Sequence, residues 1–153
     1  MSVEKAKNYL KQFNLEDRVM EFSVSSATVK DAAIAVGCSD GEIAKSLTFL
    51  IENNPIMILV AGDAKIDNKK YRDEFHIKAK MIPFEDVERL VGYAVGGVCP
   101  FGINDNVKVY LDVSLKKYEI VYPAAGSDKS AVKLTITELE KASKFLKWVD
   151  VCH

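Results

Sequence analysis

Histidine and cysteine are scarce in this chain of 153 residues, which has two of the first and three of the second. The cysteines Cys38, Cys99 and Cys152 form no CxxC pair, and their odd number argues against a disulfide framework. With only His76 and His153 beside them, a structural zinc site lacks ligands, and a Ser-His-Asp site has little support. The sequence therefore predicts a protein that needs neither a metal nor another cofactor.

Long apolar runs and a strong charge of one sign are also absent. No apolar run approaches the ~20 residues that a membrane-spanning helix needs. No apolar signal segment follows the charged residues 1–7, so we expect a cytoplasmic protein. A net charge of −1 argues against binding of nucleic acid over a broad, positively charged surface, so any RNA contact would be local or assisted by a partner. No P-loop, GxGxxG or HExxH motif is present.

What the chain does have is an ordinary globular composition, with 48% hydrophobic and 28% charged residues. No linker or repeat interrupts it, so we expect a single domain over residues 1–153. Residue patterns predict helices over 2–13, 29–36, 68–75, 84–91 and 137–147, and strands over 18–22, 46–51, 55–61, 78–81, 107–112, 118–122 and 132–136. The predicted fold class is α+β, with a mixed sheet or partly closed β-barrel and helices outside.

Several boundaries carry a clear chemical signal. Thr28 is a typical N-cap for the second helix, and Gly37 is its typical stop. Asn53-Asn54 predicts the turn of a hairpin, and the apolar run 56–61 predicts a strand buried on both faces. Thr137 with Glu140 predicts a capping box at the start of the last helix.

Three glycines and a proline fall within one stretch of seven residues, Gly96-Gly97-Val98-Cys99-Pro100-Phe101-Gly102. Such a stretch is either a tight turn between strands or a shaped loop whose backbone a ligand can approach. A second feature is Lys45, which ends a helical turn predicted over residues 42–45 and precedes an apolar strand. Taken alone, it is typical of a strand-end lysine whose ammonium reaches water.

Together these features resemble the YbaK/ProX family of aminoacyl-tRNA editing domains, which includes the domain inserted in bacterial prolyl-tRNA synthetase. The resemblance extends from about residue 28 to residue 139 and rests on three blocks in the family's order. The blocks are Ile43-Ala44-Lys45-Ser46-Leu47, the glycine-rich stretch 96–102, and Ala124-Ala125-Gly126-Ser127 leading into Val132-Lys133-Leu134.

The resemblance implies hydrolysis of the ester that joins a wrong amino acid to the 3′ adenosine of a tRNA. That amino acid would be small, such as cysteine, alanine, serine or threonine, and the choice among them stays open. Because an aminoacyl ester is already activated, positioning and oxyanion stabilisation are enough to accelerate its hydrolysis. The implied partners are the acceptor end of a mischarged tRNA and, as a second partner, an aminoacyl-tRNA synthetase.

The resemblance also implies the site residues. Lys45 would supply a positive charge to the substrate's 3′ end, and Gly97 would let the backbone approach the ester. The substrate-binding residues would be Thr28, Ser46, Gly96, Val98, Cys99, Pro100, Phe101, Gly102 and Gly126, with residues 22–28 and 98–101 as pocket walls. Two alternatives remain: a non-catalytic module that binds aminoacyl-tRNA or a synthetase, and a hydrolase with Cys99 as nucleophile.

Overall fold

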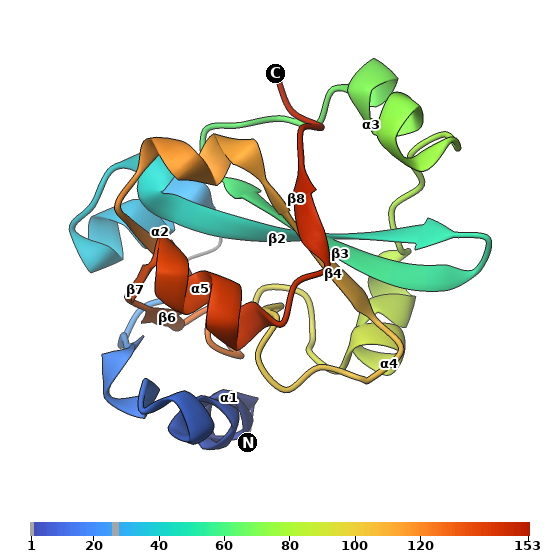
Figure 1. The fold of residues 1–153 in the computed structure, drawn as a ribbon. Helices are drawn as coiled ribbons and strands as arrows, with labels where there is room; N and C mark the ends of the chain where they lie inside the picture. The colour runs from blue at the N-terminus through green and yellow to red at the C-terminus, as the bar shows by residue number, and fades with distance from the viewer. Residues whose placement is uncertain (1, 26–27) are drawn as a thin grey trace.

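The centre of the fold is a long antiparallel hairpin of β2 (Ile43–Ile51) and β3 (Asn54–Ala61), seen in a computed structural model that describes residues 2–25 and 28–153 (Figure 1). Its register runs from Ala44↔Ala61 to Ile51↔Asn54. Glu52 and Asn53 turn the chain with φ of 50° and 71°, as two-residue hairpin loops require. The predicted turn at Asn53-Asn54 was therefore one residue too late.

Strands on both sides of this hairpin complete a mixed, six-stranded sheet in the order β7-β5-β2-β3-β4-β8. The added strands are β4 (Lys108–Asp112), β5 (Ile120–Pro123), β7 (Leu134–Thr135) and β8 (Lys147–Val149). The pairs β2–β5, β3–β4 and β4–β8 are parallel, and the pairs β2–β3 and β5–β7 are antiparallel. A separate two-stranded sheet pairs β1 (Val19–Glu21) with β6 (Ser130–Val132). These pairings confirm the α+β fold class.

Residues 56–61 of β3 are almost inaccessible to solvent, which confirms the prediction that this strand is buried on both faces. The α-helices are α1 (Ser2–Leu10), α2 (Val29–Val36), α3 (Asn68–Phe75), α4 (Val87–Val91) and α5 (Ile136–Ser143). Short 3-10 turns cover Lys11–Phe13, Glu16–Arg18, Asp40–Glu42, Phe84–Asp86 and Val113–Lys117. In the described ranges, no helix has both the length and the apolar character needed to span a membrane.

Helix α2 follows its sequence signals. The Thr28 hydroxyl oxygen accepts a hydrogen bond from the Asp31 N–H at 3.1 Å, and Gly37 ends the helix with φ 85°. The last helix starts earlier than predicted, because the capping box is Thr135 with Glu138 and not Thr137 with Glu140.

The last helix also ends earlier than predicted. Lys144 adopts a left-handed conformation, and the Leu146 N–H donates to the Val109 carbonyl. Residues 147–149 consequently join β4 as β8 instead of extending the helix.

Two further differences lie near β2. Residues 42–45 form no helical turn of their own, because the 3-10 turn ends at Glu42 and β2 begins at Ile43. Lys45 is therefore inside the strand. Residues 78–81 do not form a separate strand either. They contribute a single bridge, Phe49↔Met81, to the edge of β2.

Candidate functional site

The edge of β2 that faces away from β3 is paired at its two ends only. Strand β5 pairs with Ile43 and Ala44. Further along, the Leu50 N–H donates to the Lys80 carbonyl at 2.8 Å, and the Thr48 carbonyl accepts from the Ile82 N–H at 3.1 Å. Backbone groups of alternate residues face the same edge of a strand, so the N–H and C=O of Ser46 face the gap between these two pairings.

Prolines and a glycine near the gap explain why neither neighbouring segment closes it. Strand β5 ends at Pro123, which has no N–H to continue the ladder. The chain then turns away through Gly126, whose φ is 99°. On the other side Pro83 follows Ile82 directly and begins the 3-10 turn Phe84–Asp86. The sequence thus leaves a short stretch of strand edge unpaired inside the molecule.

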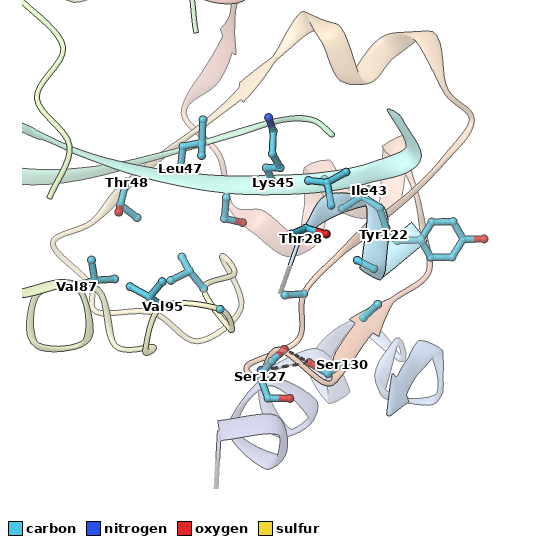
Figure 2. Close-up of a pocket in the computed structure, with 18 of the residues that line it drawn as sticks. Thr28, Ile43, Lys45, Leu47, Thr48, Val87, Val95, Tyr122, Ser127 and Ser130 are labelled. Atoms are coloured by element: carbon cyan, nitrogen blue, oxygen red, sulfur yellow. Dashed lines mark hydrogen bonds between the residues drawn. The ribbon is translucent and has the colours of Figure 1, made fainter. Parts of the chain in front are cut away.

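A cavity of about 440 Å³ opens at this gap. One wall is β2 itself, where Thr48 points toward Val87 and Val95 (Figure 2). Ser46 lies two residues from Thr48 and therefore shares its face of the strand. The opposite wall contains the glycine-rich loop, at Gly96 and Val98, and the turn that follows β5.

That turn is held by the Ser130 side chain. Its Oγ accepts from the Ser127 N–H at 3.2 Å and donates to the Ser127 carbonyl at 2.8 Å (Figure 2). It also accepts from the Ala125 N–H at 3.1 Å. Thr28 lines the cavity from the start of α2, where its hydroxyl is already used as the helix cap. Of the predicted wall 22–28, Phe22 and Thr28 line the cavity, and residues 26 and 27 lie outside the described residues.

Ser46 carries a buried hydroxyl that has no hydrogen-bond partner among the described residues. Ser143 Oγ and the Tyr71 hydroxyl share this property, but of the three residues Ser46 is the one that lines this cavity. A buried polar group without a partner costs stability, so such groups in folded proteins call for a specific explanation. A ligand group seated against β2 would supply the missing partner.

Lys45 also belongs to the cavity-lining part of β2, but its side chain lies on the other face of the strand. It points away from Val95, Thr28 and Ser127 (Figure 2). Its Nζ donates to the Ala64 carbonyl at 2.7 Å. Burial lowers the pKa of Lys45, while the nearby Cys152 and Asp63 act against that shift. The ammonium, expected to face the substrate, is thus anchored behind the cavity wall.

The glycine-rich loop contributes less of itself to the cavity than its residue types suggest. Gly96 and Val98 line it, whereas Gly97 is buried, and its N–H donates to the Ala94 carbonyl at 3.0 Å. A Cβ on Gly97 would lie 2.4 Å from the carbonyl carbon and oxygen of Gly126. The absence of a side chain at Gly97 therefore allows the backbones of two loops to touch each other. The resemblance implied a different role, in which this glycine lets the substrate approach the backbone.

The remaining predicted residues lie behind the cavity. Cys99, Pro100, Phe101 and Gly126 are buried, Gly102 is half-buried, and none of the five lines the cavity. The resemblance implied that they contact the substrate; in the structure they lie behind Gly96 and Val98, which line the cavity. The physical reason is that the hydrophobic Cys-Pro-Phe stretch packs into the core more favourably than it faces a wet cavity.

Cys99 is fully buried, and this burial raises the pKa of its thiol to about 12, although hydrogen bonds with Phe101 and Tyr93 act against the shift. Burial likewise raises the pKa of Cys152 to about 12 and that of Cys38 to about 11. A raised pKa means that the neutral thiol dominates at pH 8, and the neutral thiol is a poor nucleophile.

We therefore expect all three thiols of the native protein to react slowly with thiol reagents at pH 8, and the buried Cys99 and Cys152 to become accessible only when the protein is denatured. A thiol-disulfide colour assay in buffer and in guanidinium measures both rates. If the site hydrolyses an ester, as the sequence resemblance implies, Cys99→Ser should keep substantial activity. One fast-reacting thiol whose alkylation abolishes activity would instead identify a cysteine nucleophile.

Sequence reasoning missed several lining residues, among them Ala44, Thr48, Met81, Phe84, Val95 and Ser130. Ala44 and Thr48 were findable, because both alternate with Ser46 along β2. The others come from segments that approach β2 only in three dimensions. No group of three or more histidine, cysteine, aspartate or glutamate residues that could hold a metal ion is found in residues 2–25 and 28–153.

Comparison with known proteins agrees with this architecture. The family model of the aminoacyl-tRNA editing domain matches residues 24–142. The uncharacterized protein YwhH of Bacillus subtilis is 48% identical over 153 residues, covering 99% of this chain and 98% of YwhH. EbsC of Enterococcus faecalis, provisionally named a Cys-tRNA(Pro)/Cys-tRNA(Cys) deacylase, is 25% identical over 133 residues, covering 84% of this chain and 81% of EbsC.

A solved structure, described as that of a proposed trans-editing enzyme for prolyl-tRNA synthetase, matches with a TM-score of 0.90 and 31% identity, covering 99% of this chain and 97% of the other. The YbaK/ProX resemblance inferred from the sequence blocks is thereby confirmed. Since the family model covers most of the chain and the fold agrees with it, the protein belongs to the aminoacyl-tRNA editing domain family.

Proposed function

We propose that the protein is a free-standing trans-editing deacylase that hydrolyses the ester of a tRNA mischarged with a small amino acid. The observation that carries this proposal is the unpaired edge of β2 at Ser46, which faces a cavity of about 440 Å³. The family membership supports the reaction class, and the names of EbsC and of the solved relative point to tRNA(Pro) or tRNA(Cys).

The backbone of Ser46 provides the main chemistry in this proposal. In ester hydrolysis the carbonyl oxygen becomes negatively charged as water or a group of the substrate attacks the carbonyl carbon. A fixed N–H donor in a site that excludes water stabilises that charge more than solvent does. The Ser46 N–H faces the gap and is held by a strand that is paired along its other edge, so it can act as such a donor. The Ser46 hydroxyl would bind a second polar atom of the aminoacyl group.

The cavity walls favour a small amino acid. Ala44, Val29, Ala32 and Val98 offer short apolar surfaces and no charged group. A side chain such as that of alanine or cysteine fits such a surface with little desolvation cost, whereas a charged side chain would lose its hydration without a partner. Discrimination among small apolar side chains by such a pocket amounts to about 1–3 kcal/mol per methylene group.

Lys45 would act in this site through its charge. Its ammonium lies behind β2 and not in the cavity, but charges interact across a protein wall. At about 10 Å and an effective dielectric constant of ~20, two unit charges still interact by roughly 1.7 kcal/mol. A positive charge at this place therefore favours an oxyanion that forms on the cavity side of the strand.

Lys45→Met is therefore expected to lower the deacylation rate by about tenfold, since roughly 1.4 kcal/mol of barrier corresponds to a tenfold change. It should also lower the melting temperature, because the bond to the Ala64 carbonyl is lost. Single-turnover rates measured well below the melting temperature of each variant separate the two effects. Lys45→Arg keeps the charge and should recover part of the rate. A well-folded Lys45→Met protein with wild-type rates would refute this role.

The function itself is tested by a deacylation assay. Transfer RNAs for proline and cysteine are charged with cysteine, alanine, serine, threonine or proline and incubated with the protein. We expect at least one mischarged species to be hydrolysed and correctly charged Pro-tRNA(Pro) to be spared. The scarcity of histidine and cysteine predicts that EDTA leaves the rate unchanged. Tight binding of aminoacyl-tRNA without turnover would favour the non-catalytic module and contradict the proposal.

A further inference from the structure

Three large apolar side chains stand exposed at the edge of the cavity. Phe84 is 74% exposed, Met81 57% and Val95 48%, and all three line the cavity. Exposed apolar side chains are common singly, but a group of them around one opening marks a contact surface. Phe84 is the most exposed of the three and is also the only aromatic one.

Phe84 is held firmly despite its exposure. It begins the 3-10 turn Phe84–Asp86 directly after Pro83, and the Asp86 N–H donates to the Pro83 carbonyl at 2.9 Å. The neighbours Ile82 and Val87 are buried and fix the turn from both sides. Such an aromatic ring presents apolar surface at little cost in conformational entropy.

The path along the backbone from the proposed ester site to this ring is short. Ser46 and Thr48 share one edge of β2, and the Thr48 carbonyl accepts the hydrogen bond of Ile82, two residues before Phe84. In an aminoacyl-tRNA, the ester is attached to the ribose that also carries the terminal adenine. A substrate with its ester at Ser46 must therefore place that adenine near the mouth of the cavity.

The charge around Phe84 selects a neutral group over a phosphate. Glu85 and Asp86 follow the ring in its own turn, and Glu88 lies in the first turn of α4. Asp86 has a partner in Arg89, at 3.1 Å, but Glu85 and Glu88 are exposed acidic groups that repel phosphate oxygens. A nucleobase has an uncharged, flat surface that fits an exposed aromatic ring.

We propose that Phe84 is the stacking platform for the terminal adenine of the aminoacyl-tRNA, with Met81 and Val95 as its apolar border. This inference rests on the proposed function and extends it from the ester to the base. Stacking of a base on an aromatic ring contributes enough that its loss lowers affinity about five- to a hundredfold. Phe84 is thus a positioning residue, whose removal should affect substrate binding more than the chemical step.

The test compares substrates with and without the base. Phe84→Ala, Phe84→Trp and the control Leu146→Ala, an exposed apolar residue that does not line the cavity, are assayed on mischarged tRNA, on 3′-O-alanyl-adenosine and on alanine methyl ester. We expect Phe84→Ala to lose about five- to a hundredfold in kcat/KM, mainly through KM, on the first two substrates only. Phe84→Trp should retain activity, and Leu146→Ala should match the wild type.

Ligand-observed NMR with adenosine, which carries the base without a phosphate, provides a readout that does not depend on turnover. Adenosine should bind the wild type and Phe84→Trp, and should bind Phe84→Ala much more weakly. If the wild type hydrolyses no ester but adenosine binding still depends on Phe84, the proposed function fails and the platform stands. If Phe84→Ala binds adenosine like the wild type, or loses activity equally on the methyl ester, the platform is refuted.

Discussion

Ser46→Ala is expected to lower the deacylation rate about ten- to a hundredfold while leaving the protein as stable as the wild type or slightly more stable. The loss of rate follows from removing one hydrogen bond to a charged or developing-charge group, about 1.5–3 kcal/mol. The stability is preserved because the Ser46 hydroxyl is buried and has no partner in the part of the chain that the structure describes. Removing an unsatisfied buried hydroxyl does not break any native interaction. Single-turnover deacylation and a thermal melt measure the two quantities.

Ser143→Ala is the matched control for this experiment. Ser143 also has a buried hydroxyl without a partner, but it belongs to α5 and does not line the cavity at β2. Its replacement should therefore change the stability in the same way and leave the deacylation rate unchanged. If both variants keep wild-type activity, Ser46 Oγ does not contact the substrate. If Ser46→Ala melts several degrees lower, the hydroxyl has a structural partner in the native protein and is not free to bind a ligand.

Gly97→Val is expected to destabilise the fold strongly and to abolish deacylation. A Cβ at this position would lie 2.4 Å from the Gly126 carbonyl group and 2.6 Å from the Ser127 nitrogen, so the backbones of two loops would have to separate. Overpacking of this kind costs about 1–3 kcal/mol or more. For a protein of this size each kcal/mol corresponds to roughly 2–4 °C in melting temperature. Because both loops line the cavity, its shape is lost even in molecules that remain folded.

Gly37→Ala separates this clash from ordinary backbone strain. Gly37 has a φ of 85°, but a Cβ there would meet nothing within 4 Å. Its replacement should cost only the strain of a left-handed residue, roughly 1–2 kcal/mol, with no loss of activity at temperatures where the protein is folded. Thermal melts and deacylation rates of the two variants show whether the effect at Gly97 exceeds that of backbone strain alone. A Gly97→Val protein that melts like the wild type would contradict the contact between the two loops.

Local signals in the sequence were accurate where the relevant interaction is local. The cap of α2 at Thr28 and its stop at Gly37 depend on atoms within a few residues, so they could be predicted from residue types. The same holds for β3, whose uninterrupted apolar residues indicate burial on both faces. The capping box of α5 was predicted two residues too late, because Thr135 and Thr137 offer the same local pattern with Glu138 and Glu140. Packing then selected one of them.

The sequence blocks alone led to the family. They also suggested Lys45, Ser46 and the glycine-rich loop as candidate site residues. They could not show which face of β2 meets the cavity, since that depends on which distant segments pack against each face. Because Val87 and Val95 pack on the Thr48 side, Ser46 lies on the cavity side and Lys45 on the opposite side, since consecutive residues of a strand face opposite ways. Nor could they show that Gly97 packs on Gly126, or that residues 80–82 and β5 leave Ser46 unpaired between them. These contacts join segments far apart in the chain, and only close packing in three dimensions decides which of them form.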